Sequence, residues 1–329
     1  MNAKKNAEKE WLRKLNAGQT AKKEETKSPT QAAEVQFEPE PPRRETMSGF
    51  KAVAGMDELK QFVTEGFINV LNNRECAKAF GITPPSLLFY GPAGCGKTFF
   101  AEKISEELGI NFIKVVPDDL ASTLVHGTQQ KIGEVFHKAA KKAPTIIFFD
   151  EFDAMVPQRT SDDRSYQNGE TNEFLCMLNN AAEKGVYVLA ATNHPERIDK
   201  AVLRTGRIDE MIYVDMPDST ARESLFRLSL SSLPAADNID YGHLANLTKG
   251  YNCSDISYII KVASRKMFNA SIQEKDKPYK VITQQLLEET IAQKAPSVSS
   301  RDLKEFERLR CEFSPKDKGC QPATIGFHL

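Results

Sequence analysis

Apolar residues gather into short runs that alternate with stretches of helical spacing between residues 50 and 217. These apolar runs are of strand length and predict β-strands at 87–90, 112–116, 146–149, 186–191 and 211–214. Helical spacing predicts helices at 56–70, 97–108, 129–142 and 170–183. Apolar strands that alternate with helices are typical of a parallel sheet covered on both faces. The pattern therefore predicts a doubly wound α/β domain.

Beyond residue 217 the strand-like runs stop and only helical spacing remains. Helices are predicted at 220–233, 241–247, 254–273, 284–291 and 301–310. The resulting organisation is an α/β domain at 46–217, a helical domain at 218–312 and a loosely ordered tail at 313–329. Residues 1–45 are polar and contain four prolines, which predicts a disordered tail. The alternative for this tail is a partner-docking peptide around Trp11.

The composition argues against a few classes of protein without identifying one. The 329 residues include 44 Lys and Arg against 45 Asp and Glu, a net charge of −1, without the basic excess typical of nucleic-acid binding. No apolar run approaches the length of a membrane span, and the N-terminus has no apolar segment typical of a secretory signal. The six cysteines form no CxxC pair, which argues against a disulfide framework or a zinc site. We therefore expect a cytoplasmic protein without a membrane span.

The pattern GxxxxGK[ST] occurs in full at Gly91-Pro92-Ala93-Gly94-Cys95-Gly96-Lys97-Thr98. It follows a predicted strand and opens a predicted helix, the context that a phosphate-binding loop requires. Glycines let backbone amides curl around phosphates, and the helix N-terminus adds a positive dipole end. Lys97 is expected to reach the β- and γ-phosphates of ATP, and Thr98 to offer its hydroxyl to Mg²⁺. A chance match in a glycine-rich turn is the alternative.

Two acids and an amide follow the other central strands. Asp150 and Glu151 come directly after 146–149, the arrangement of a Walker B segment. Asp150 is expected to hold Mg²⁺ through water, and Glu151 to orient and polarise the attacking water. The alternative is that both acids simply end a strand at the surface. Asn193 ends the strand at 186–191, where a polar side chain can position water near the γ-phosphate.

Several motifs together resemble the AAA (AAA+) ATPases, in the group of valosin-containing-protein-like unfoldases, katanin and spastin. Besides the phosphate loop, the matching stretches are Phe50–Gly55, Asp150–Ala154, Ala191–Pro195, Leu203–Asp209, Gly250–Ile256 and Ala295–Ser299. The resemblance covers about 50–312 and is specific, because motifs of low individual weight recur in a fixed order.

The resemblance implies a large P-loop domain with a helical lid, assembled into a homo-oligomeric ring, usually a hexamer, with ATP between subunits. Asn193 matches the family's sensor 1. Arg204 and Arg207 match its arginine-finger pair, supplied to the neighbouring subunit. The residues that match the nucleotide pocket are Val53, Ala54, Phe99, Leu225, Cys253 and Ser254, together with Pro92, Ala93, Gly94, Cys95, Gly96, Lys97 and Thr98 of the loop.

Two departures from the family pattern bear on function. Cys253 stands where the family has glycine, which adds bulk near the adenine. The central-pore segment aligns with 123–126, and Leu124 stands at the position of the aromatic residue that grips threaded polypeptide. This places processive threading in doubt, though not ATP turnover.

The leading functional hypothesis is an ATP-hydrolysing, Mg²⁺-dependent ring that remodels or disassembles a protein complex. Its protein substrate is unidentified, and the tail at 1–45 is a candidate for recruiting it. Two alternatives are a nucleotide-switched scaffold with little turnover and a nucleic-acid motor. The argument against the scaffold is that all the residues of the site are intact: Lys97, Asp150, Glu151, Asn193, Arg204 and Arg207. The charge balance argues against the motor.

Overall fold

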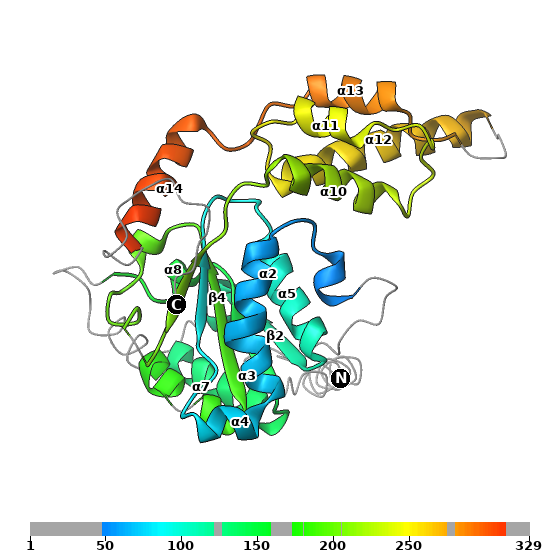
Figure 1. Cartoon of the computed structure of the whole chain (residues 1–329). Coiled ribbons are helices and arrows are strands. Elements are labelled where there is room, and N and C mark those ends of the chain that lie inside the picture. Colours follow the sequence, from blue (N-terminus) through cyan, green and yellow to red (C-terminus); the bar gives the residue numbers. More distant parts are fainter. Residues whose placement is uncertain are drawn as a thin grey trace, which may run out of the picture. The chain divides into compact units, whose positions relative to one another are not determined.

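The fold is built on a sheet of five parallel strands (Figure 1). The computed structural model describes residues 48–121, 127–158, 173–179, 181–204, 206–274 and 280–313. The strands are β1 (Leu87–Tyr90), β2 (Asn111–Val115), β3 (Thr145–Phe149), β4 (Val186–Thr192) and β5 (Glu210–Tyr213). Their order across the sheet is β2-β3-β4-β1-β5. This order brings the carboxyl ends of β1, β4 and β3 side by side, where ligands bind in open α/β sheets.

Helices connect the strands and continue beyond the last of them. They are η1 (Gly49–Ala52), α2 (Asp57–Val63), η2 (Thr64–Ile68), α3 (Asn69–Asn72), α4 (Arg74–Ala79), α5 (Lys97–Leu108), α6 (Pro117–Leu120), α7 (Gly127–Lys141), α8 (Phe152–Met155), η3 (Ala182–Lys184), η4 (Pro195–Arg197), α10 (Ser219–Leu230), α11 (Tyr241–Leu247), α12 (Cys253–Glu274), α13 (Gln284–Ala292) and α14 (Ser300–Phe313). Residues 173–179 are also helical. The predicted helix at 56–70 is interrupted, because η2 is a π-helical turn between α2 and α3.

Alternate residues of the strands face two different layers of helices. Phe89 of β1 and Phe148 of β3 belong to a buried cluster that also contains residues of α2 and α5. Phe149, the next residue along β3, contacts Phe136 of α7 and Phe174 instead, with ring centroids 6.0 and 4.8 Å apart. The period of two explains why β1, β3 and β4 are buried throughout, since each contributes to a core on both faces of the sheet.

A second hydrophobic cluster lies entirely within the part of the chain after β5. It includes Phe226 of α10, Leu244 of α11, Ile259 of α12 and Leu287 of α13, all fully buried. Three of these helices are capped at their N-termini, where the side chains of Asp218, Asp240 and Thr283 accept hydrogen bonds from backbone amides of the first turn. The last helix, α14, contacts the sheet: Phe313 meets Tyr90 edge-on, and Arg310 lies over the ring of Tyr213.

The parallel sheet with helices on both faces, followed by helices alone, confirms the predicted fold class. The domain boundaries at 46–217 and 218–312 stay a prediction. Across the described ranges, no helix has both the length and the apolar character that a membrane crossing needs. Four cysteines, at 76, 95, 176 and 253, are free thiols, whereas Cys311 is disulfide-bonded.

Candidate active site

The phosphate loop joins β1 to α5, and its glycines are required by backbone geometry at two positions. Gly91 has φ 142° and Gly94 has φ 75°, conformations that favour glycine. A Cβ atom on Gly91 would lie 2.3 Å from the carbonyl oxygen of Val214, and one on Gly94 would lie 2.6 Å from Nδ2 of Asn252. The loop therefore turns tightly against both β5 and the segment before α12.

Lys97, the first residue of α5, points back into the loop. Its Nζ donates hydrogen bonds to the carbonyl oxygens of Gly91 and Pro92, each at 2.9 Å, and to Oδ1 of Asn193 at 2.6 Å. Only 8% of the residue is exposed, and this burial lowers the pKa of Lys97 to about 8, against the opposing effect of Asp150. The structure therefore brings Lys97 and Asn193 together, from the ends of α5 and β4.

Thr98 and Asp150 meet across the same edge of the sheet. Thr98 Oγ1 donates a hydrogen bond to Asp150 Oδ2 at 3.0 Å, and the same oxygen lies 2.9 Å from Nζ of Lys114. A hydroxyl and a carboxylate this close are hard oxygen donors of the kind that Mg²⁺ prefers. These two residues therefore fit a Mg²⁺ ion, and Lys114 is a neighbour that the sequence analysis missed.

Glu151 follows Asp150 in an unusual backbone conformation. Its φ of 52° is in the left-handed region, which is uncommon for residues other than glycine and often marks functional positions. The backbone amide of Glu151 donates to Asp150 Oδ1 at 3.1 Å, and Glu151 itself is exposed at the start of α8. The turn thus directs two consecutive carboxylates differently, one toward Thr98 and one toward solvent.

A side-chain hydrogen bond connects the end of β4 to α8. Thr192 Oγ1 donates to Asp153 Oδ1 at 2.5 Å and accepts a hydrogen bond from the backbone amide of His194 at 2.8 Å. These contacts hold Asn193, between Thr192 and His194, beside the turn that carries Glu151. Asp153 and Thr192 were not predicted as site residues, although both lie within the motifs that carry the family resemblance.

Arg204 and Arg207 lie in the segment before β5, and their contacts are with other residues than those described above. Arg204 is exposed, and Arg207 donates from Nη1 to the carbonyl oxygen of Ala201 at 2.6 Å. Asp209 shapes the turn by accepting hydrogen bonds from the amides of Ser86 and Gly206. Among the described residues, no hydrogen bond or ion pair joins either arginine to the phosphate loop of its own chain.

The segment before α12 forms the other wall of the phosphate loop. Asn252 Nδ2 donates to the carbonyl oxygen of Ala93 at 3.0 Å, and the amide of Ser254 donates to that of Gly94 at the same distance. Cys253 Sγ lies 3.6 Å from the carbonyl oxygen of Cys95. Cys253 and Ser254 were predicted pocket residues. Asn252 was missed, although it directly precedes them.

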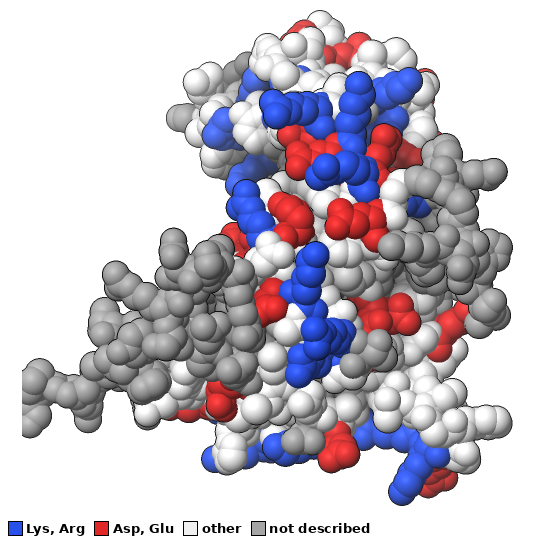
Figure 2. All heavy atoms as spheres, turned by 90° about the vertical axis from the view of Figure 1, so that its left-hand side faces the viewer, with Lys and Arg blue, Asp and Glu red and all other residues white. Residues whose placement is uncertain are grey.

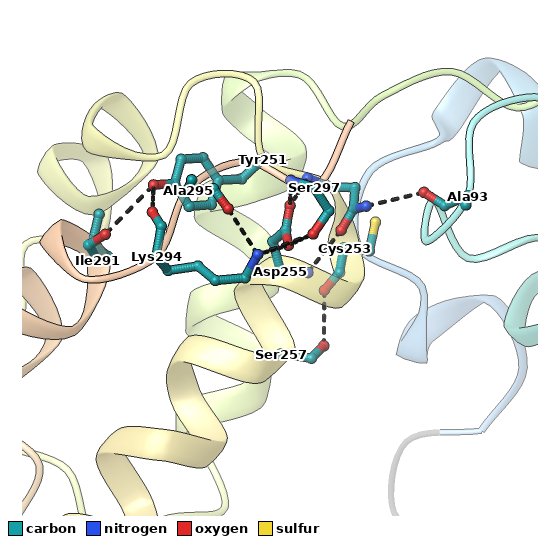
Figure 3. A network of polar contacts seen from close by, with 10 residues as sticks. Ala93, Tyr251, Cys253, Asp255, Ser257, Ile291, Lys294, Ala295 and Ser297 are labelled. Carbon is teal, nitrogen blue, oxygen red and sulfur yellow. Dashed lines mark hydrogen bonds and ion pairs between the residues drawn. The ribbon is translucent and has the colours of Figure 1, made fainter. Parts of the chain in front are cut away.

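A buried carboxylate organises this wall (Figure 3). Asp255 accepts from the backbone amide of Ser297 at 3.0 Å and pairs with Lys294 at 2.7 Å, and the Ser297 hydroxyl also donates to it. Its own amide donates to Oδ1 of Asn252 at 2.7 Å. A continuous set of contacts therefore runs from the 294–297 segment through Asp255 and Asn252 to Ala93.

The remaining predicted pocket residues differ in their exposure to solvent. Val53 and Ala54 are buried, Leu225 is half-buried and Phe99 is 44% exposed. Burial raises the pKa of Cys95 to about 12 and that of Cys253 to about 11, so both thiols stay protonated near neutral pH. The predicted pore residue Leu124 and the tail at 1–45 lie outside the described residues.

The sheet, the phosphate loop and the carboxylate at the end of β3 define the class: a P-loop nucleotide-binding α/β protein. The sequence profile of the "ATPase family associated with various cellular activities (AAA)" matches residues 87–216. The Cell division cycle protein 48 homolog of Archaeoglobus fulgidus is 34% identical over 272 residues, which cover 79% of this chain and 37% of that protein. Residues 87–216 thus match an AAA ATPase domain, which confirms the predicted resemblance. The chain spans little more than a third of this relative's length.

Proposed function

We propose that this chain binds and hydrolyses ATP with Mg²⁺ at the phosphate loop, and that it remodels or disassembles a protein complex as a subunit of a homo-oligomeric ring, expected to be a hexamer. The observation that carries the proposal is the convergence of Lys97, Asn193 and the Thr98–Asp150 pair at one edge of the sheet. Each group suits a different part of a Mg²⁺–triphosphate.

The loop and α5 provide the binding step. Backbone amides of the loop and the N-terminus of α5 face the phosphates, and Lys97 adds a positive charge beside them. Thr98 and Asp150 would hold Mg²⁺, which when bound neutralises charge on the phosphate oxygens. Val53, Ala54 and Cys253 would then lie against the adenine, as the family resemblance implies.

Two side chains provide the chemical step. The exposed carboxylate of Glu151 accepts a hydrogen bond from the attacking water and polarises it, while the amide of Asn193 positions that water. The strained turn at Glu151 supports this role, because it separates the polarising carboxylate from Asp150, which faces Thr98.

The two arginines support the proposed ring. Arg204 is exposed, and the side-chain contact of Arg207 is to Ala201, so neither is held at its own phosphate loop. An arginine that serves another subunit requires a head-to-tail interface, which closes into a ring when the rotation permits. We therefore assign both residues to the neighbouring subunit's ATP.

A protein substrate is favoured over a nucleic acid by the distribution of charge. The face drawn in Figure 2 carries Lys and Arg interspersed with Asp and Glu, and the whole chain has a net charge of −1. Binding that depends on phosphate neutralisation would want a continuous basic surface. The tail at 1–45 as a recruiting segment and a cytoplasmic location stay predictions.

The test compares wild type with Glu151→Gln, which keeps the shape of the side chain and removes its charge. Wild type should release phosphate from ATP, and the variant should bind a fluorescent ATP analogue with unchanged affinity but release almost none. Protein captured by the variant in ATP, and not in ADP, would identify the substrate. Tight binding with negligible turnover in wild type would favour the nucleotide-switched scaffold instead.

A further inference from the structure

Lys114 is the exposed residue of an otherwise largely buried edge strand, and its charge is directed at the Mg²⁺ position. Its Nζ lies 2.9 Å from Asp150 Oδ2, the oxygen that also accepts the hydrogen bond from Thr98 at 3.0 Å. The other oxygen, Oδ1, accepts the amide of Glu151. The ammonium group therefore occupies the side of the carboxylate that faces Thr98.

The backbone fixes this placement. Lys114 of β2 is paired with Phe148 of β3, two residues before Asp150, and the amide of Asp150 donates to the carbonyl oxygen of Val115 at 3.0 Å. The two Cα positions are thus set by the sheet. The side chain of Lys114 is 41% exposed, and its four-carbon stem leaves the ammonium free to swing into water.

An ammonium and a Mg²⁺ ion compete for the same carboxylate oxygen. Asp150 is expected to hold Mg²⁺ through water, so a water bound to the ion needs this oxygen as its acceptor. A positive charge in hydrogen-bond contact with the same oxygen opposes the approach of the cation. We propose that Lys114 is a positioning residue that competes with Mg²⁺ for Asp150 and so raises the Mg²⁺ concentration needed for tight nucleotide binding. The inference rests on the proposed Mg²⁺ position at Thr98 and Asp150.

The size of the effect follows from the exposure of the pair. Ion pairs that are partly exposed contribute little, so removing the ammonium should lower the required Mg²⁺ concentration by about twofold to fivefold. Nucleotide affinity in the absence of Mg²⁺ should not change, because Lys114 acts on the carboxylate and not on the phosphates. A lysine that instead contacts phosphate would strengthen nucleotide binding with and without the metal.

The experiment measures binding of a fluorescent ADP during a Mg²⁺ titration that begins in EDTA. Lys114→Met keeps most of the stem and should shift the midpoint down by the stated factor, with unchanged affinity in EDTA, whereas Lys114→Arg should stay near wild type. Lys60→Met is the matched control, because Lys60 pairs with Asp57 at 3.2 Å on α2, and it should leave the midpoint unchanged. Asp150→Asn should abolish the effect of Lys114→Met.

The outcomes separate the two ideas. If binding by wild type depends on Mg²⁺ and Lys114→Met has the same Mg²⁺ midpoint as wild type, the role of Lys114 is overturned. The proposed Mg²⁺ position then stays intact. Equal weakening of ADP binding in EDTA and in Mg²⁺ shows a phosphate ligand and also overturns it. If wild-type binding does not respond to Mg²⁺ at all, the proposed Mg²⁺ position fails, and this inference fails with it. Lys114→Gln repeats the measurement should Lys114→Met fold poorly.

Discussion

The ammonium group of Lys97 donates a hydrogen bond to Oδ1 of Asn193 at 2.6 Å, which joins the start of α5 to the end of β4. The contact is possible because β1, which leads into the phosphate loop, is paired in parallel with β4, with Tyr90 opposite Thr192. The residue proposed to bind phosphate and the residue proposed to position water are thus held by adjacent strands. A displacement of either Lys97 or Asn193 therefore disturbs the hydrogen bond between them.

Asn193→Ala should therefore separate binding from turnover. Lys97 keeps its two carbonyl acceptors in the loop, so affinity for ATP should change little, while loss of the amide that positions water should slow hydrolysis by roughly 100-fold or more. Phosphate release and the affinity for a fluorescent ATP analogue should be measured on the same preparation. Wild-type turnover in Asn193→Ala would remove Asn193 from the chemical step.

Arg204→Ala should cripple hydrolysis while leaving nucleotide affinity nearly intact, since arginine fingers contribute about 10³–10⁵ in rate. Arg204 is the cleaner site, because Arg207 also holds the carbonyl oxygen of Ala201. Mixing Arg204→Ala with Lys97→Ala subunits should restore part of the turnover, because some interfaces then combine one intact half from each. Turnover should also rise steeply with protein concentration.

The matched control for that experiment is Arg197→Ala. Arg197 is an exposed arginine on η4, near Glu196, and its loss should leave turnover unchanged. A monomer that is fully active in sedimentation analysis, or an absence of rescue on mixing, would show that the arginines do not act between subunits.

The elements of the fold could be predicted because each carries its own periodicity. Helices 97–108 and 241–247 are found within those bounds, and the five strands shift by a residue at most at either end. The phosphate loop was equally predictable, since glycine is required at Gly91 and Gly94 by φ and by close neighbours. These features depend on residues that are close together in the chain, so they can be predicted from a single sequence.

Contacts between distant segments could not be predicted in the same way. Lys114 approaches Asp150 because β2 pairs with β3, and Asn252 reaches Ala93 from 159 residues further along the chain. Neither residue belongs to a periodic pattern, and a lysine in an edge strand is ordinarily a solvated charge. Sheet order and the packing of α12 on the loop decide these contacts, and neither is visible in local spacing.

Asn252→Asp tests whether the segment before α12 supports the nucleotide site. The substitution keeps an oxygen for the amide of Asp255 but replaces the donor to Ala93 with an oxygen, which then faces a carbonyl. Loss of one hydrogen bond of about 1 kcal/mol predicts roughly fivefold weaker nucleotide binding. Isothermal titration should show this, whereas Asn269→Asp, at an exposed position of α12, should bind like wild type. Equal nucleotide affinities of wild type and Asn252→Asp would show that the contact between Asn252 and Ala93 does not contribute to binding.

Leu124 is predicted to grip substrate weakly in the pore of the ring. Burying an aromatic side chain removes about 150–250 Å² from water, and leucine offers less contact area, so we expect local remodelling and not the processive unfolding of stable domains. Leu124→Asp should abolish remodelling with basal ATPase largely kept, and Leu124→Tyr should hold or strengthen it. The alternative is that Leu124 packs onto its own domain. Processive unfolding of a tightly folded fusion by wild type would contradict the prediction.

Asp255 should make the stability of the protein depend on pH in the acid range. Burial raises the pKa of this carboxyl, but hydrogen bonds from Lys294, Ser297 and Asn252 outweigh it and hold the pKa below the ordinary value of 3.8. The folded state therefore favours the carboxylate more than the unfolded state does. Its contribution to the free energy of unfolding is present above pH 3.8 and is lost as the pH falls through the folded-state pKa.

Asp255→Asn removes this titration while keeping the size of the side chain. Urea unfolding of wild type and variant over a series of pH values between neutrality and about pH 3 should show wild type more stable at the upper end, with the difference shrinking below the ordinary pKa of 3.8. Taking the difference cancels the other carboxyls, which titrate in both proteins. Asp237→Asn, at an exposed position, should show no such trend. A difference that stays constant with pH would mean that Asp255 titrates alike in the folded and unfolded chains.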